Sequence, residues 1–145
     1  MTERDAYNEL CAYTLTHGDP TFIHQHVVDA FTAQTAHPDT KPIALTFALV
    51  GLYLHLRREF TGRQVQLAHQ YLARRKRSWP SFPLPDDRGS ITATVVLASP
   101  PGSARDEAIH AWCASVLDAY RKSEEELKAL LSSYGDVFYS GLFKT

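Results

Sequence analysis

Proline and glycine divide this chain into stretches whose apolar residues repeat with the period of an α-helix. Pro20 and Pro42 each lie at the start of such a stretch, and Gly18 follows the end of the first one. Proline fits the first turn of a helix because the N–H that it lacks has no partner there, whereas glycine fits the left-handed position after a helix. This punctuation predicts an all-α fold.

We expect a single domain over residues 1–145, a bundle of about five helices whose core needs no disulfide or metal for support. The expected helices span residues 4–16, 19–36, 42–60, 61–77 and 103–134. The third should lie at the centre, because its apolar residues cover nearly its whole circumference. Residues 78–102 hold five of the eight prolines, so we expect a Pro-rich loop there, with 91–97 either extended or a short helix.

Two of these helix starts carry capping signals. Thr61 and Gln64 have the spacing of a capping box, in which each side chain bonds to the backbone N–H of the other residue. Ser103 and Asp106 have a similar spacing at the start of the last helix. Within that long helix, Ser123 is a position where the helix could kink or a new one could begin.

Composition restricts the class of protein. A hydrophobic share of 44% with 21% charged residues is typical of a globular domain and excludes a mostly disordered chain. Two cysteines far apart in the sequence give no disulfide framework and favour a reducing compartment, so we expect a cytoplasmic protein. The longest apolar stretch, 42–56, is shorter than the ~20 residues that a membrane-spanning helix needs, so we expect no membrane partner.

Charge is distributed unevenly along the chain. The whole chain has a formal net charge of -1, but residues 57–77 contain seven Lys or Arg and one Glu. The run 74–77 is typical of a solvated helix end, where cations offset the negative end of the dipole. The alternative is a patch for an anionic ligand. Nucleic acid is the less favoured ligand, because no aromatic residue alternates with these basic residues and no known binding module fits.

Several histidines lie on or beside faces that should meet the core. On a helical wheel of residues 19–36, His24 and Gln34 share the face of the apolar residues, and His26 lies at the edge of that face. Asp29 points nearly the opposite way. His55 lies on the apolar third helix, one turn before its end.

Thiols and imidazoles from four helices form a candidate metal site. The candidate metal ligands are Cys11, His24, His69, His110 and Cys113. Imidazole and thiolate bind divalent transition metals, and helix bundles build such sites from facing helices, although the metal itself stays unknown. No CxxC or HExxH spacing supports the site. The alternative is that each cysteine packs as a small hydrophobic residue and each histidine makes one core hydrogen bond.

We therefore expect a polar site within the bundle, centred on His24. The leading function is a metal-dependent or acid/base small-molecule enzyme, with His24, Gln34 and His69 as the catalytic residues. The alternative is a non-catalytic ligand-binding or regulatory module that uses a cavity or a homodimer face. An anionic ligand or nucleic acid bound through residues 57–77 ranks below both.

The segment HQHVVDAFTAQ, followed by GLYLHLRREFTGRQVQ, resembles a family of small bacterial proteins known only as a domain of unknown function. Members carry an H-x-x-x-[VI]-D-A-[YF]-x-x-Q segment and then a long apolar helix that ends in a charged turn. The resemblance implies His24, Asp29 and Gln34 as the polar positions of the family. Many relatives also have a CPxC lead-in that this chain lacks, so a metal site built with that lead-in has no counterpart here.

Overall fold

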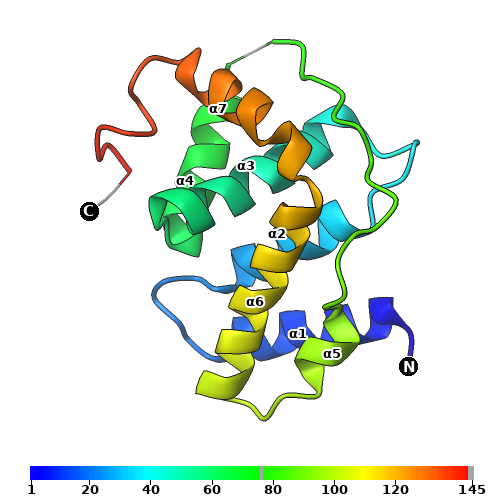
Figure 1. Ribbon diagram of the computed structural model, residues 1–145. Coiled ribbons are helices and arrows are strands. Elements are labelled where there is room, and N and C mark those ends of the chain that lie inside the picture. Colours follow the sequence, from blue (N-terminus) through cyan, green and yellow to red (C-terminus); the bar gives the residue numbers. More distant parts are fainter. Residues whose placement is uncertain (76, 144–145) are drawn as a thin grey trace.

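The computed structural model describes residues 1–75 and 77–143, and over this part of the chain it contains helices and no strands (Figure 1). Helices make up 62% of the structure, which confirms the predicted all-α fold. The described helices are α1 (Glu3–Thr16), α2 (His24–Gln34), α3 (Pro42–Arg58), α4 (Gly62–Ala73), α5 (Ala93–Leu97), α6 (Ser103–Ala119) and α7 (Glu124–Ser132), with a 3-10 turn η1 (Arg121–Ser123) before α7. The predicted count of about five helices is therefore too low.

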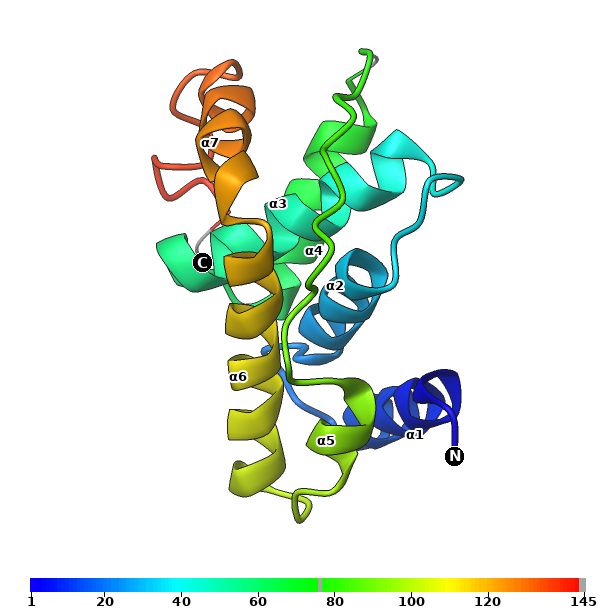
Figure 2. The same cartoon turned by 45° about the vertical axis from the view of Figure 1, so that its right-hand side comes forward.

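Helices α2 and α3 form the centre of the molecule. α2 packs against α1, α3, α4 and α6, whereas α3 packs against α2, α4, α6 and α7. Every residue of α3 from 48 to 54 is buried, as predicted from a helix that is apolar nearly all round. Helices α1 and α5 lie at one end of the molecule, and α4, α7 and the C-terminal residues lie at the other (Figures 1 and 2).

Local capping signals place some helix boundaries correctly. The Thr61–Gln64 capping box is present at the start of α4, and Gly18 adopts a φ of 62° just after α1, in the left-handed region. Helix α2 begins at His24 rather than near Asp19. The Asp19 carboxyl instead accepts hydrogen bonds from the backbone N–H groups of Thr21 and Ile23, which closes a turn before the helix.

The predicted long helix 103–134 is wrong, because it is divided into α6 and α7. The break covers residues 120–123 and includes Ser123, the position that the sequence marks for a kink. The Ser103–Asp106 capping signal is also wrong, since no side chain caps α6, and Gly102 is its N-cap. The side chain of Asp106 is used elsewhere, as described below.

The Pro-rich segment runs along the molecule from the end of α4 to α5 (Figure 2). Gln34 at the end of α2 ties this segment down, because its amide nitrogen donates to the Ile91 carbonyl at 2.7 Å and its amide oxygen accepts from the Trp112 indole at 2.9 Å. Residues 93–97 form α5, which confirms the short-helix alternative. None of the described helices is both long and apolar enough to cross a membrane.

Candidate functional site

Three histidines from three different helices meet at one place in the bundle. The rings of His26 on α2 and His55 on α3 are stacked, with 3.6 Å between their centroids and 19° between their planes. The His55 Nε2 atom lies 3.3 Å from Nδ1 of His110 on α6. The three rings therefore form a continuous group, which we call the histidine cluster.

Two strained backbone positions lie close to this cluster in the sequence. Phe22, just before α2, and Glu59, at the end of α3, each have a φ of 59°, which is uncommon for residues other than glycine. The Phe22 carbonyl lies against Gly62 at the start of α4, where a Cβ atom would overlap it. The loop before α2 is thus pressed against the start of α4. Such backbone strain is concentrated at functional sites in proteins, which makes the cluster a candidate site.

The hydrogen bonds determine where the protons of two of these imidazoles lie. The Phe60 carbonyl, 3.0 Å from His55 Nδ1, can only accept, so Nδ1 of His55 carries the proton. Nε2 of the neutral ring is then an acceptor, and His110 Nδ1–H donates to it. As a result, Nε2 of a neutral His110 has a free lone pair.

A pocket with a volume of about 360 Å³ opens beside the cluster. It is lined by three apolar residues and seven polar ones: Ile23, Phe60 and Ile109, together with Thr21, His26, His55, Glu59, Thr61, Asp106 and His110. The charged groups of this lining are two carboxyl groups, and no Lys or Arg is among them. The lining therefore combines apolar side chains with carboxyl and imidazole groups.

His26 is the most deeply buried member of the cluster. Its side chain is 5% exposed, and its Nδ1 atom is buried with no hydrogen-bond partner in the described part of the chain. Burial, followed by the neighbouring His55 and His110, lowers the pKa of His26 to about 3. Burial also lowers the pKa of His55. Both rings are thus neutral at physiological pH, and an unpaired polar atom of this kind calls for a ligand or a water.

Asp106, which also lines the pocket, is held in place by α1. The Tyr13 hydroxyl donates to Asp106 Oδ1 at 3.0 Å, and the backbone N–H of Gly102 donates to the same hydroxyl at 2.9 Å. Asp106 precedes His110 by four residues on α6, so both side chains lie on one face of the helix. The pocket therefore has a fixed carboxyl group one turn from an imidazole.

Two of the predicted catalytic residues lie away from the histidine cluster. His24 is half-buried, and its Nδ1 bonds to the Thr14 hydroxyl at 3.0 Å. His69 Nε2 bonds to the Phe47 carbonyl at 2.7 Å, and the ring stacks on that of Phe47. Each has the single hydrogen bond expected of a structural histidine. Gln34, the third, holds the Pro-rich segment as described above.

The five predicted metal ligands are also divided among separate places. His110 alone belongs to the pocket. Cys113 is fully buried, with its thiol directed at the His26 carbonyl, and Cys11 is half-buried on α1. Burial raises the pKa of both thiols, so both are protonated and unreactive as nucleophiles at neutral pH.

A metal ion does not fit the histidine cluster in this arrangement. No group of three or more His, Cys, Asp or Glu side chains within residues 1–75 and 77–143 is placed to hold one. The ring stacking explains this result. An imidazole binds a metal in its ring plane, and the nearly parallel planes of His26 and His55 are separated by stacking distance, so one ion cannot lie in both.

His26 and His55 are the members of the site that the sequence reasoning missed. The wheel placed His26 at the edge of the core-facing side, and His55 was noted only for its place near the end of the third helix. A usable signal was present for His55. A polar ring on a helix that is apolar nearly all round must face another element, because no side of such a helix faces water.

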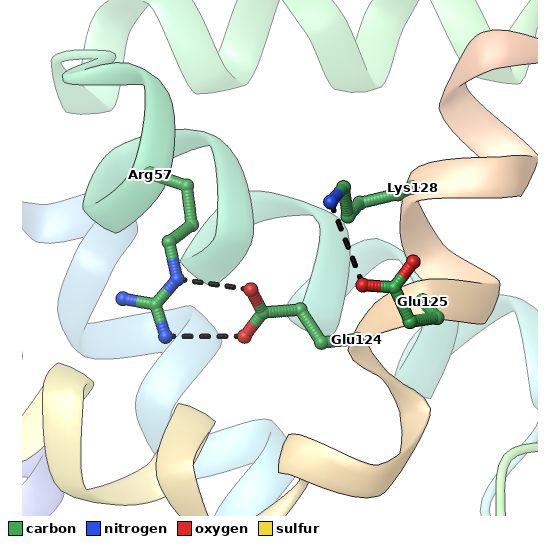
Figure 3. Close-up of polar contacts among 4 residues, drawn as sticks. All are labelled: Arg57, Glu124, Glu125 and Lys128. Atoms are coloured by element: carbon green, nitrogen blue, oxygen red, sulfur yellow. Dashed lines mark hydrogen bonds and ion pairs between the residues drawn. The ribbon is translucent and has the colours of Figure 1, made fainter.

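The basic residues of 57–77 mostly contact other side chains. Arg57 donates to both carboxylate oxygens of Glu124 at the start of α7, at 3.0 and 3.1 Å (Figure 3). The guanidinium of Arg75 lies over the ring of Tyr71, and that of Arg77 lies over the ring of Tyr134. Lys76 lies outside the described residues. These contacts favour a structural use of the basic residues over an open anion-binding patch.

Comparisons with known proteins give a family and nothing beyond it. A family model described as a family of unknown function (DUF5946) matches residues 4–121 of the chain. No curated protein and no solved structure matches the chain. The family match confirms the predicted resemblance, but it does not test the motif positions, which stay a prediction.

Proposed function

The chain belongs to DUF5946, a family of unknown function, and we propose that it binds a small molecule in the pocket beside the histidine cluster and moves a proton at that ligand through His110. The observation that carries this proposal is a pocket lined by three histidines and by the fixed carboxyl group of Asp106. Small-molecule sites combine an apolar lining with a few convergent polar groups, as this pocket does.

The size and lining of the pocket support a small ligand. At about 360 Å³ it lies near the lower end of the range for small-molecule sites, roughly 300–1,000 Å³. Ile23 and Ile109 offer contact to an apolar part of the ligand. The polar groups of the lining fix its orientation, as is usual in sites of this kind.

His110 is the residue that accepts the proton. Its Nε2 has a free lone pair because Nδ1–H is donated to His55. When Nε2 takes a proton, the His110 ring becomes positively charged, and the hydrogen bond to the neutral His55 ring stabilises that charge. The Phe60 carbonyl keeps His55 in the accepting tautomer. His55 is therefore a positioning residue, and His110 is the acid–base group.

The test is a fragment screen read by NMR of histidine side chains. With imidazole nitrogens labelled, a fragment that occupies the pocket should shift the signals of His26, His55 and His110. The rings of His24 and His69 have their own partners elsewhere and serve as internal controls, so their signals should stay in place. Replacement of His110 by Phe should abolish acid–base chemistry at the ligand without unfolding the protein, because this side chain is exposed. Fragments that shift only His24 or His69 would contradict the proposal.

A further inference from the structure

We propose that the ligand of this pocket is a small organic amine, with its ammonium group between Asp106 and His110 and its apolar part against Ile23 and Ile109. This inference rests on the proposed function, since it names the chemical class of the molecule that occupies the same pocket. It follows from three observations: the charge of the lining, the fixation of Asp106 and the acceptor that His110 leaves open.

The charge of the lining favours a cation. Glu59 and Asp106 are carboxyl groups, and no Lys or Arg of the described part of the chain lines the pocket to offset them. The nearest basic side chain on α6, Arg105, is turned to the preceding loop, where it donates to the carbonyls of Ser99 and Leu97. An anionic ligand would meet two like charges in this pocket, whereas an ammonium group would meet two opposite ones.

Asp106 is held ready to accept a hydrogen bond from such a group. The Tyr13 hydroxyl occupies Oδ1, while Oδ2 accepts no hydrogen bond from residues 1–75 and 77–143. A carboxylate whose orientation is already fixed loses little conformational freedom on binding a ligand. Charge-assisted hydrogen bonds to such a group are also among the strongest in proteins.

His110 adds an acceptor that suits an ammonium group. Its Nε2 carries a lone pair that no donor of residues 1–75 and 77–143 occupies, one helical turn from Asp106. An ammonium group carries three N–H donors and no acceptor, so it matches Asp106 Oδ2 and His110 Nε2 together.

The test uses matched probes that differ only in the polar group. Each set contains a primary amine, its alcohol and its carboxylate, for example 2-phenylethylamine, 2-phenylethanol and 3-phenylpropionate, and a series of alkyl and aryl sets covers different apolar parts. Binding is measured by calorimetry, and the site is identified by histidine NMR. We expect at least one amine to shift His26, His55 and His110 and to bind about tenfold or more tightly than its alcohol and its carboxylate.

Variants then test whether the charge of Asp106 causes the preference for amines. The Asp106→Asn change should lower amine affinity about tenfold or more while leaving the affinity for the alcohol nearly unchanged. The matched control is Asp118→Asn, an exposed carboxyl on the same helix that does not line the pocket, which should change neither affinity. Equal loss of amine and alcohol affinity in Asp106→Asn would overturn the role of its charge.

The outcomes separate this inference from the proposed function. If alcohols or carboxylates shift the three histidines and amines bind no better, the amine inference is overturned and the small-molecule pocket stands. If Zn²⁺ alone shifts the three histidines and displaces the amines, the pocket is a metal site and the inference is also overturned. If no probe of any set shifts these histidines, both proposals fail.

Discussion

At the scale of single residues, Asp29 is the least expected side chain in the fold. Its carboxyl group is 3% exposed, Oδ1 accepts from the Gln25 amide, and Oδ2 is buried without a partner among the described residues. It lies against α3 at Gly51, where a Cβ atom would overlap it. Burial raises the pKa of this carboxyl well above 3.8. In the native protein it therefore stays protonated at pH values at which an exposed aspartate is ionised.

The Asp29→Asn variant should therefore become more stable relative to the wild type as the pH rises. Above about pH 4 the unfolded chain releases the Asp29 proton that the folded chain retains, so the wild type loses stability with rising pH up to the raised pKa. The loss amounts to at most about 1.4 kcal/mol per pH unit, and the isosteric asparagine avoids it. Urea denaturation at a series of pH values measures the difference in the free energy of unfolding.

The histidines with lowered pKa values change the free energy of unfolding with pH in the opposite direction. Because the variant and the wild type contain the same histidines, this contribution cancels in their difference. The matched control is Asp39→Asn at an exposed carboxyl, for which the difference from the wild type should not grow with pH. A difference for Asp29→Asn that is equally flat would show that this carboxyl ionises normally in the folded protein.

The position of Asp29 also explains why the wheel did not pick out the buried Asp29 and His26 on α2. A helical wheel assumes that one face of a helix meets the core and the opposite face meets water. Because α2 packs against four helices, Asp29 is buried although it lies opposite the apolar face, and His26 is buried although it lies at the edge. The number of neighbours depends on the tertiary fold, which helical periodicity does not describe.

At the scale of elements, the Pro-rich segment depends on Arg88. Its guanidinium NH1 lies within hydrogen-bond distance of the Ala33, Gln34 and Ala36 carbonyls at the end of α2, at 3.4, 3.1 and 2.9 Å. The last carbonyls of a helix have no partners within the helix, so a cation there satisfies them and opposes the negative end of the dipole. Arg88 therefore acts as the C-terminal cap of α2.

Replacement of Arg88 by Met should lower the free energy of unfolding by about 2–3 kcal/mol, because it leaves half-buried carbonyls unpaired and frees the segment from α2. Arg88→Lys should recover only part of this loss, since an ammonium group does not have the planar donor array of a guanidinium. The matched control is Arg121→Met, at an exposed arginine whose side chain bonds to the Asp118 carbonyl three residues earlier, which should cost less than about 0.5 kcal/mol. Chemical denaturation of the three variants measures these changes in the free energy of unfolding. An equal cost for Arg88→Met and Arg121→Met would contradict the capping role.

Local signals predicted the helix boundaries that depend on neighbouring residues, and they missed a boundary that coincides with long-range contacts. The Thr61–Gln64 box and Gly18 depend on neighbouring residues only, and both are present in the structure. The break at 120–123 coincides with two long-range contacts. The Tyr120 hydroxyl donates to the Ala33 carbonyl, and Glu124 pairs with Arg57. Contacts between residues so far apart in the sequence leave no trace in helical periodicity.

At the scale of the whole molecule, the basic residues of 57–77 help to join the α4 end of the bundle to α7 and the C-terminal residues. Arg57 pairs with Glu124, and Figure 3 shows this pair bridging the end of α3 and the start of α7. Arg58 lies over the ring of Tyr139, and Arg77 lies over the ring of Tyr134 while donating to Ser133. Most of the described basic residues that make the charge uneven therefore contact other side chains within the fold.

Arg77→Gln should therefore lower the free energy of unfolding by about 0.5–1 kcal/mol, the value of an exposed cation–π contact. Its hydrogen bond to Ser133 is lost as well, but both partners then bond to water, which keeps the cost small. Arg63→Gln is the control, because the exposed Arg63 side chain donates, among residues 1–75 and 77–143, only to Gln66 of its own helix, and its cost should stay below about 0.5 kcal/mol. Neither variant should change retention on a duplex oligonucleotide, which the wild type should bind only through weak, salt-sensitive contacts. Tight binding to the duplex that both variants weaken without loss of stability would instead identify these arginines as phosphate contacts.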